Sequence, residues 1–135
     1  MTSVLDASVL LKWFIEESGS ELALDLKSLY LNREIEIIIP DLALYEIPNV
    51  LRFKRSIPES QLRSVMQAFW LLDIEIVAPN EALLEEGIHL SFATGLSFYD
   101  CSYLALARQI DATLITADRH LFNAASKFVP TQFIH

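Results

Sequence analysis

Four acidic residues that are far apart in the chain lie at positions where acids are seldom tolerated without a reason. Asp6 follows the apolar run "SVL", and Asp118 comes two residues after "LIT", so both are expected at strand ends. Glu46 shares one predicted helical stripe with Asn49 and Phe53, and Asp100 recurs with apolar residues at the same spacings of three and four. These spacings predict inward-facing positions on helices. Acids are rarely buried unless they pair with a base or bind a cation. The four residues are therefore candidates for a catalytic or metal-binding site.

Each of these acids also has a purely structural interpretation. Asp6 and Asp118 are placed to cap the helices that follow them, Asp100 can complete a capping box with Ser97, and Glu46 can pair with a nearby base. A cap contributes only about 1 kcal/mol, whereas two carboxylates about 4 Å apart repel by roughly 4 kcal/mol at an effective dielectric near 20. If the acids meet, bound protons or a divalent cation must offset this repulsion.

The secondary-structure pattern predicts that the acids do meet. Short, continuous apolar runs alternate with helical patterns, and we expect strands near residues 3–6, 35–40, 74–79, 112–116 and 129–134. Continuous rather than alternating runs are typical of a parallel sheet covered by helices on both faces. Ligands of such sheets bind at the carboxyl ends of the strands. Asp6 and Asp118 are expected there.

Length and hydropathy favour one compact domain over residues 1–135. No linker, repeat or low-complexity segment interrupts the 135 residues. The longest apolar runs are broken by charge within a dozen residues and the start of the chain lacks the pattern of a signal peptide, so we expect a cytoplasmic protein without a membrane span. The 53% hydrophobic content and the mean hydropathy of +0.35 suggest apolar surface for a partner or a second copy, with Trp13, Phe14, Phe69 and Trp70 as candidates.

The net charge of −8 argues against passive binding to nucleic acid, because a phosphate backbone is attracted by basic groups. The best basic patch is "RFKR", which contains Arg52, Lys54 and Arg55. Such a run is commonly a solvated helix end, but here it follows the predicted helix that carries Glu46. The three residues are therefore the candidates for any contact with a phosphate backbone.

The residue types narrow the chemistry to metal-dependent phosphoryl transfer. An all-oxygen ligand set suits Mg²⁺ or Mn²⁺, whereas a zinc site is disfavoured by a single cysteine and three histidines without ligand spacing. The Asp-x-Asp of haloacid-dehalogenase phosphatases is absent because Ser8 stands two residues after Asp6. The adjacent acids of response-regulator receivers and the P-loop are absent as well. Metal-activated water attacking a phosphodiester is the remaining interpretation.

Four segments resemble, in order and spacing, the acidic motifs of the PIN-domain nucleases, and most closely the VapC-like toxins of prokaryotic toxin–antitoxin pairs. The segments are "VLDASVLLKWF", "PDLALYEIPNVL", "SFYDCSYLALA" and "LITADRHL", and together they span essentially the whole chain. This resemblance implies a three-layer α/β PIN-like fold with a central parallel five-stranded sheet flanked by helices. It also implies an endoribonuclease that depends on Mg²⁺ or Mn²⁺, is inhibited by a cognate antitoxin and is commonly a homodimer.

The resemblance assigns a role to each acid. Asp6 and Asp100 would be the principal metal ligands, and Asp118 a further ligand or a water-positioning acid. Glu46 would be the fourth catalytic acid, holding a metal or acting through water.

Three more residues match supporting positions of the family. Ser8 and Thr116 match small hydroxyl positions beside the acids, and Asn49 matches a polar position one turn after Glu46. His120 stands where many members carry another acid, so the number of metal ions stays open.

Two alternatives to a nuclease toxin remain at this point. The first is a catalytically silent PIN-like module that binds RNA or protein, although the presence of all four acids argues against it. The second is a housekeeping RNA-processing nuclease without an antitoxin, which a neighbouring gene for a small DNA-binding protein would exclude.

Overall fold

The five strands form one parallel sheet in the computed structural model, which describes residues 1–135. Their bounds are β1 (Thr2–Leu5), β2 (Glu36–Pro40), β3 (Glu75–Val77), β4 (Thr113–Thr116) and β5 (Thr131–Phe133). The strand order is β3-β2-β1-β4-β5, and every neighbouring pair is parallel. The predicted parallel five-stranded sheet is confirmed.

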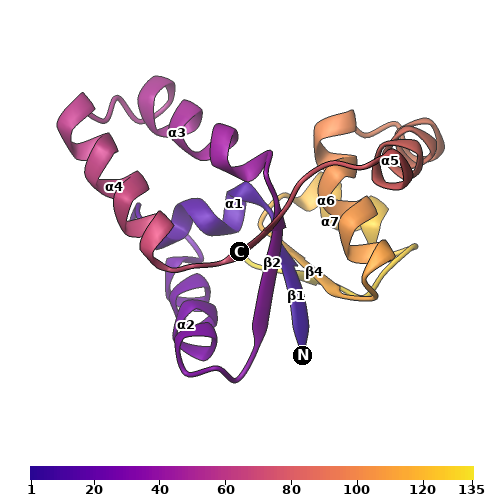
Figure 1. Ribbon diagram of the computed structural model, residues 1–135, viewed down its shortest axis with the longest axis horizontal. Coiled ribbons are helices and arrows are strands. Elements are labelled where there is room, and N and C mark those ends of the chain that lie inside the picture. Colours follow the sequence, from indigo (N-terminus) through magenta and orange to yellow (C-terminus); the bar gives the residue numbers. More distant parts are fainter.

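Helices cover both faces of this sheet. They are α1 (Ala7–Leu10), the 3-10 helix η1 (Leu11–Trp13), α2 (Ser20–Leu31), α3 (Ala43–Phe53), α4 (Glu59–Leu71), α5 (Glu81–Thr94), α6 (Phe98–Gln109) and α7 (Arg119–Ala125). Figure 1 shows α1 to α4 on one side of the sheet and α5 to α7 on the other. The three-layer α/β architecture is therefore confirmed. None of the helices combines the length and apolar character needed to cross a membrane.

Helix α6 contributes more buried residues than any other helix. It begins after Ser97, whose hydroxyl caps the backbone N–H of Asp100 at 3.1 Å, and it packs against β1, β2 and β4. Six of the seven residues that follow Asp100, from Cys101 to Ala107, are buried, and Ser102 is partly buried. Cys101 is fully buried among them, as expected for a small apolar side chain.

The strand order reverses direction between β1 and β4, because the chain first builds outward through β2 and β3 and then returns to add β4 and β5 on the other side. Such a switch point leaves a crevice at the carboxyl ends of the two central strands. Leu5 pairs with Ile115, so the residues that follow these two strands lie side by side. The switch point therefore brings Asp6 close to Thr116 and the segment after it.

The inward face of α3 differs from the expected one. The buried residues are Ala43, Ile47 and Leu51, whereas Asn49 and Phe53, which the spacing had placed inward, are exposed. Both stripes of this helix contain apolar residues, and packing against α1 and α4 selects the one that is buried. Glu46 lies beside the buried stripe and is half-buried.

The four aromatic candidates for a partner surface also divide into buried and exposed residues. Trp13 and Phe69 belong to the core, and Phe14 is partly buried against Phe69. Only Trp70, with 67% of its surface exposed, remains available for a partner.

Candidate active site at the carboxyl edge of the sheet

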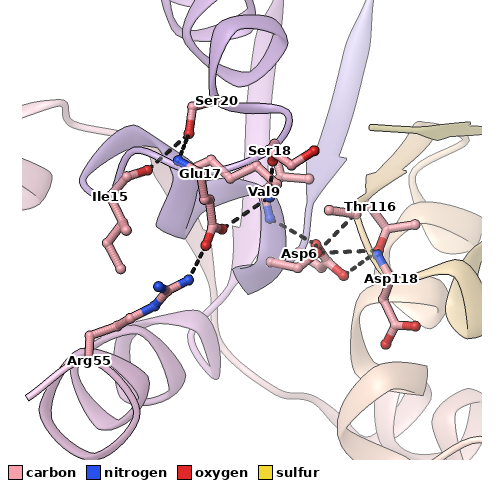
Figure 2. Close-up of polar contacts among 12 residues, drawn as sticks. Asp6, Val9, Ile15, Glu17, Ser18, Ser20, Arg55, Thr116 and Asp118 are labelled. Atoms are coloured by element: carbon pink, nitrogen blue, oxygen red, sulfur yellow. Dashed lines mark hydrogen bonds and ion pairs between the residues drawn. The ribbon is translucent and has the colours of Figure 1, made fainter. Parts of the chain in front are cut away.

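Asp6 is a buried carboxylate with hydrogen bonds to both of its oxygens. It caps α1, where Oδ1 accepts the Val9 N–H at 3.3 Å and the Ser8 hydroxyl at 2.5 Å. Oδ2 accepts the Thr116 hydroxyl at 2.6 Å, across the β1–β4 switch point (Figure 2). Burial raises the pKa of Asp6 to about 6, although these hydrogen bonds act in the opposite direction. The fold thus keeps a proton-binding or cation-binding group in its interior.

The two hydroxyl groups beside Asp6 also organise the segment after β4. The Ala117 N–H donates to Ser8 Oγ at 2.9 Å, and the Asp118 N–H donates to Thr116 Oγ1 at 3.0 Å. Since each hydroxyl donates to Asp6 and accepts from this backbone, Asp6 and Asp118 are held in a fixed relation. Ser8 and Thr116 thus connect the carboxylate of Asp6 to the backbone that precedes α7.

Asp118 caps α7 with one oxygen. Oδ1 accepts the N–H groups of His120 and Leu121 at 2.9 and 3.3 Å. No donor approaches Oδ2, so this second oxygen remains available for another ligand.

Asp100 lies in the first turn of α6 and is half-buried. Ser97 caps its backbone N–H, but the reciprocal bond of a capping box, from the Ser97 N–H to the Asp100 carboxylate, is absent. Burial raises the pKa of Asp100, and the nearby Asp118 carboxylate raises it further, while Ser97 and His120 lower it. The cap therefore explains the local helix start without using the carboxylate oxygens of Asp100.

Glu46 comes to the site from α3 and meets a tyrosine of α6. Its Oε1 accepts the hydroxyl of Tyr103 at 2.5 Å, and its Oε2 has no donor. Burial raises the pKa of Glu46; the hydrogen bond from Tyr103 lowers it, and the Asp100 carboxylate raises it again.

Asp100 is the common neighbour of the other three acids. Its charge raises the pKa values of both Asp6 and Glu46, and its own pKa is raised by Asp118. The chain thus brings its four candidate acids to one edge of the sheet. Repulsion of this kind favours the binding of a proton or a cation.

The donor set fits an oxygen-preferring divalent cation. As the side chains stand, no three or more His, Cys, Asp or Glu residues are grouped so that they could hold a metal ion. However, a carboxylate offers about four lone-pair positions, and the hydrogen bonds of Asp6 occupy three of them. Glu46 and Asp118 each keep one oxygen without a donor, and Asp100 keeps both. Such free carboxylate oxygens suit Mg²⁺ or Mn²⁺.

The basic patch at the end of α3 is only partly free. Arg55 forms an ion pair with Glu17 (Figure 2). Glu17 also accepts a hydrogen bond from the buried Lys12 at 3.0 Å. Arg52 lies over the ring of Phe53, with its guanidinium carbon 4.6 Å from the ring centroid. Arg52 and Lys54 take part in no ion pair, so these two are the bases that remain available to a phosphate backbone.

The structure differs from the sequence-based prediction at Asn49 and at Tyr103. Asn49 is exposed and forms no side-chain hydrogen bond, so nothing in the geometry connects it to the acids. Tyr103 is in the site but was not among the predicted residues. The available signal was its place on the inward stripe one turn after Asp100, since a buried tyrosine hydroxyl usually finds a partner.

Comparisons with known proteins bear on the family and the fold of the chain. The family profile described as the PIN domain matches residues 3–127. Ribonuclease VapC3 from Pyrobaculum aerophilum is 30% identical over 132 residues, an alignment that covers 95% of each chain.

Solved structures with the same architecture include two whose chains match almost completely. VapBC2 from Rickettsia felis, bound to a DNA fragment from its promoter, superimposes with a TM-score of 0.74 at 16% identity and full coverage of both chains. FitAcB from Neisseria gonorrhoeae gives a TM-score of 0.70 at 17% identity, with 96% of each chain covered. At these identities, the likeness shows a shared fold.

Proposed function

Because the chain belongs to the PIN-domain family, we propose that it is a metal-dependent endoribonuclease that hydrolyses RNA phosphodiester bonds. The observation that carries this proposal is the gathering of four acids at the β1–β4 switch point, with Asp100 next to the other three. The name of the related Ribonuclease VapC3 supports RNA as the substrate.

Asp6, Asp100 and Asp118 would hold the cation, and Glu46 would serve as the fourth catalytic acid. When bound, Mg²⁺ or Mn²⁺ supplies Lewis-acid activation of water and neutralises charge on the phosphate. Ser8 and Thr116 would hold Asp6 and Asp118 in a fixed relative position through the hydrogen bonds of their hydroxyl groups. The supporting role of Asn49 stays a prediction, because its exposed side chain forms no hydrogen bond with the acids.

Arg52 and Lys54 would hold the RNA backbone beside these acids. Both are exposed and free of ion pairs at the end of the helix that carries Glu46. Arg55 would contribute less than these two, because Glu17 already neutralises it.

We further infer that residues 1–135 act as one domain in a toxin–antitoxin pair, as a homodimer that a cognate antitoxin inhibits. The likeness to the VapBC2 complex supports this assignment. The surface offers material for such contacts: Leu84, Ile88 and Phe92 form an exposed apolar stripe on α5 at four-residue spacing. An antitoxin helix is the kind of partner that can pack its own apolar face against such a stripe.

The nuclease is tested by incubating the purified chain, freed of any partner, with a mixed RNA pool in Mg²⁺, in Mn²⁺ and in chelator. Cleavage is expected only with metal, and Asp100→Asn is expected to reduce it by at least about a hundredfold. Asp73→Asn is the matched control, because Asp73 is an exposed acid just before β3, at the edge of the sheet opposite the four acids. Cleavage that survives in Asp100→Asn, or in chelator, would exclude the assigned site.

The homodimer is tested separately by sedimentation of the purified chain. A mass near twice the 15.3 kDa of one chain is expected. A monomer at micromolar concentration would contradict this part of the proposal.

A further inference from the structure

The hydroxyl of Tyr103 is a buried polar group at the centre of the acidic site. Tyr103 is 2% exposed and lies on α6 one turn after Asp100. Its hydroxyl donates to Glu46 Oε1 at 2.5 Å. Besides burial, the nearby carboxylate of Asp6 raises the pKa of this hydroxyl, and the backbone N–H of Ala7 lowers it. It therefore lies where α6, α3 and the start of α1 meet.

The bond to Glu46 is the sole side-chain hydrogen bond between α3 and α6. The two residues are 57 positions apart in the sequence, and α3 packs mainly against α1 and α4 rather than against α6. Glu46 thus reaches the site from a helix that is anchored elsewhere. Tyr103 supplies the direct polar link between this helix and the one that carries Asp100.

Glu46 has two reasons to leave the site in the absence of this bond. A free glutamate side chain gains rotamer entropy when it is released, and the nearby Asp100 carboxylate repels it. A hydroxyl donor opposes both effects, because hydrogen bonds to charged groups are stronger than those between neutral groups. Burial and Glu46 raise the pKa of Tyr103 above its ordinary value, so the hydroxyl remains a neutral donor.

We propose that Tyr103 is a positioning residue for the hydrolysis, which holds Glu46 by Oε1 so that Oε2 is presented to the reacting groups. This inference rests on the proposed nuclease function and adds a residue to it. Tyr103 acts through Glu46 and does not itself touch the substrate.

The test compares cleavage by the parent, Tyr103→Phe, Glu46→Gln and the double variant, with kcat and KM measured separately. Tyr103→Phe keeps the buried ring and removes only the hydroxyl. It is expected to lower kcat about tenfold and to leave KM within about twofold, as for the loss of a hydrogen bond to a charged group. The double variant is expected to be no slower than Glu46→Gln alone, because the hydroxyl acts only through Glu46.

Tyr30→Phe is the matched control. The Tyr30 hydroxyl also donates hydrogen bonds, to the carbonyl groups of Leu72 and Asp73, but far from the acids. If a general loss of stability caused the effect of Tyr103→Phe, Tyr30→Phe would lower kcat as well. We expect its kcat to equal that of the parent.

The same four proteins of the cycle are also unfolded in urea, which reports on the contact without any cleavage. Non-additive changes in stability are expected, and additive changes would overturn the proposal. An unchanged kcat in Tyr103→Phe, or a double variant slowed by the product of the two single effects, would overturn it too. If the parent cuts no RNA while the stabilities are coupled, the nuclease assignment fails and the contact is structural only.

Discussion

The two edges of the parallel sheet treat acidic residues in opposite ways. At the amino edge, an open groove of about 550 Å³ lies between the ends of α2 and α4 and the starts of β2 and β3. Glu36, Asp73 and Glu75 line it together with Arg33, and all four are exposed and form no ion pair. At the carboxyl edge, the acids are half-buried or fully buried, and they repel one another across the switch point.

The contrast shows that the size of a hollow does not mark the chemistry of this protein. Exposed acids cost little because water solvates them, whereas buried acids must be stabilised by specific donors, protons or cations. The acids of the carboxyl edge incur this desolvation free energy, whereas those of the amino edge remain solvated. Perturbed carboxyl groups with convergent oxygens are the better indicator of a functional site.

The largest change in stability is expected when the buried charge of the carboxyl edge is removed with Asp6→Asn. Because burial raises the pKa of Asp6 from 3.8 to about 6, the folded chain holds a proton that the unfolded chain releases between these values. The parent therefore loses stability as the pH rises from about 4 to 6. In chelator, the advantage of Asp6→Asn is expected to grow over this window to about 3 kcal/mol.

Urea unfolding at a series of pH values measures this advantage, and RNA cleavage by the same variant should be lost. A difference in stability that is constant from pH 4 to 7 would show that the charge of Asp6 is not the cause. A nuclease that is more stable without its acid would match a site that trades stability for function.

A second comparison uses two buried hydroxyl groups. The Thr116 hydroxyl, at the carboxyl end of β4, donates to Asp6, whereas Ser3 Oγ, near the amino end of β1, is buried without a partner. Thr116→Val is expected to cost about 2 kcal/mol at pH 7 because it leaves a buried carboxylate oxygen unsatisfied. Ser3→Ala is expected to leave the free energy of unfolding unchanged or slightly higher. Equal losses in chemical denaturation would contradict the assigned roles.

The smallest effect concerns the ion pairs. Glu17 joins the buried Lys12 to Arg55 at the end of α3, on the carboxyl side of β1. Glu17→Gln is expected to cost about 1 kcal/mol, since Lys12 loses a charged partner in a partly buried site. Glu59→Gln, in an exposed pair with Arg63, is expected to cost no more than a few tenths. Thermal unfolding at low and high salt measures the loss of stability in both variants, and equal losses in Glu17→Gln and Glu59→Gln would contradict the prediction.

Much of the fold was predictable because its signals are local. Continuous apolar runs marked the strands, and Ser97 marked the start of α6, as observed. Asp6 and Asp118 could be placed at one edge because parallel strands present their carboxyl ends on the same side. These inferences need only the order of the elements.

The interior face of α3 could not be predicted with the same means. Both stripes of this helix carry apolar residues, and Asn49 and Phe53 were assigned to the wrong one. A helical period identifies which residues share a face, but the neighbouring helices decide which face is covered. The same reason placed Trp13 and Phe69 in the core and left Trp70 exposed.

The order of strands and helices and the identity of the acids follow from the amino-acid sequence, because periodicity and residue chemistry are properties of neighbours in the chain. The packing of the layers, by contrast, places Asp100 near the other three acids, pairs Glu17 with Arg55, and brings the Tyr103 hydroxyl to Glu46. Those contacts join helices from distant parts of the chain, and their geometry depends on how the layers pack on the sheet.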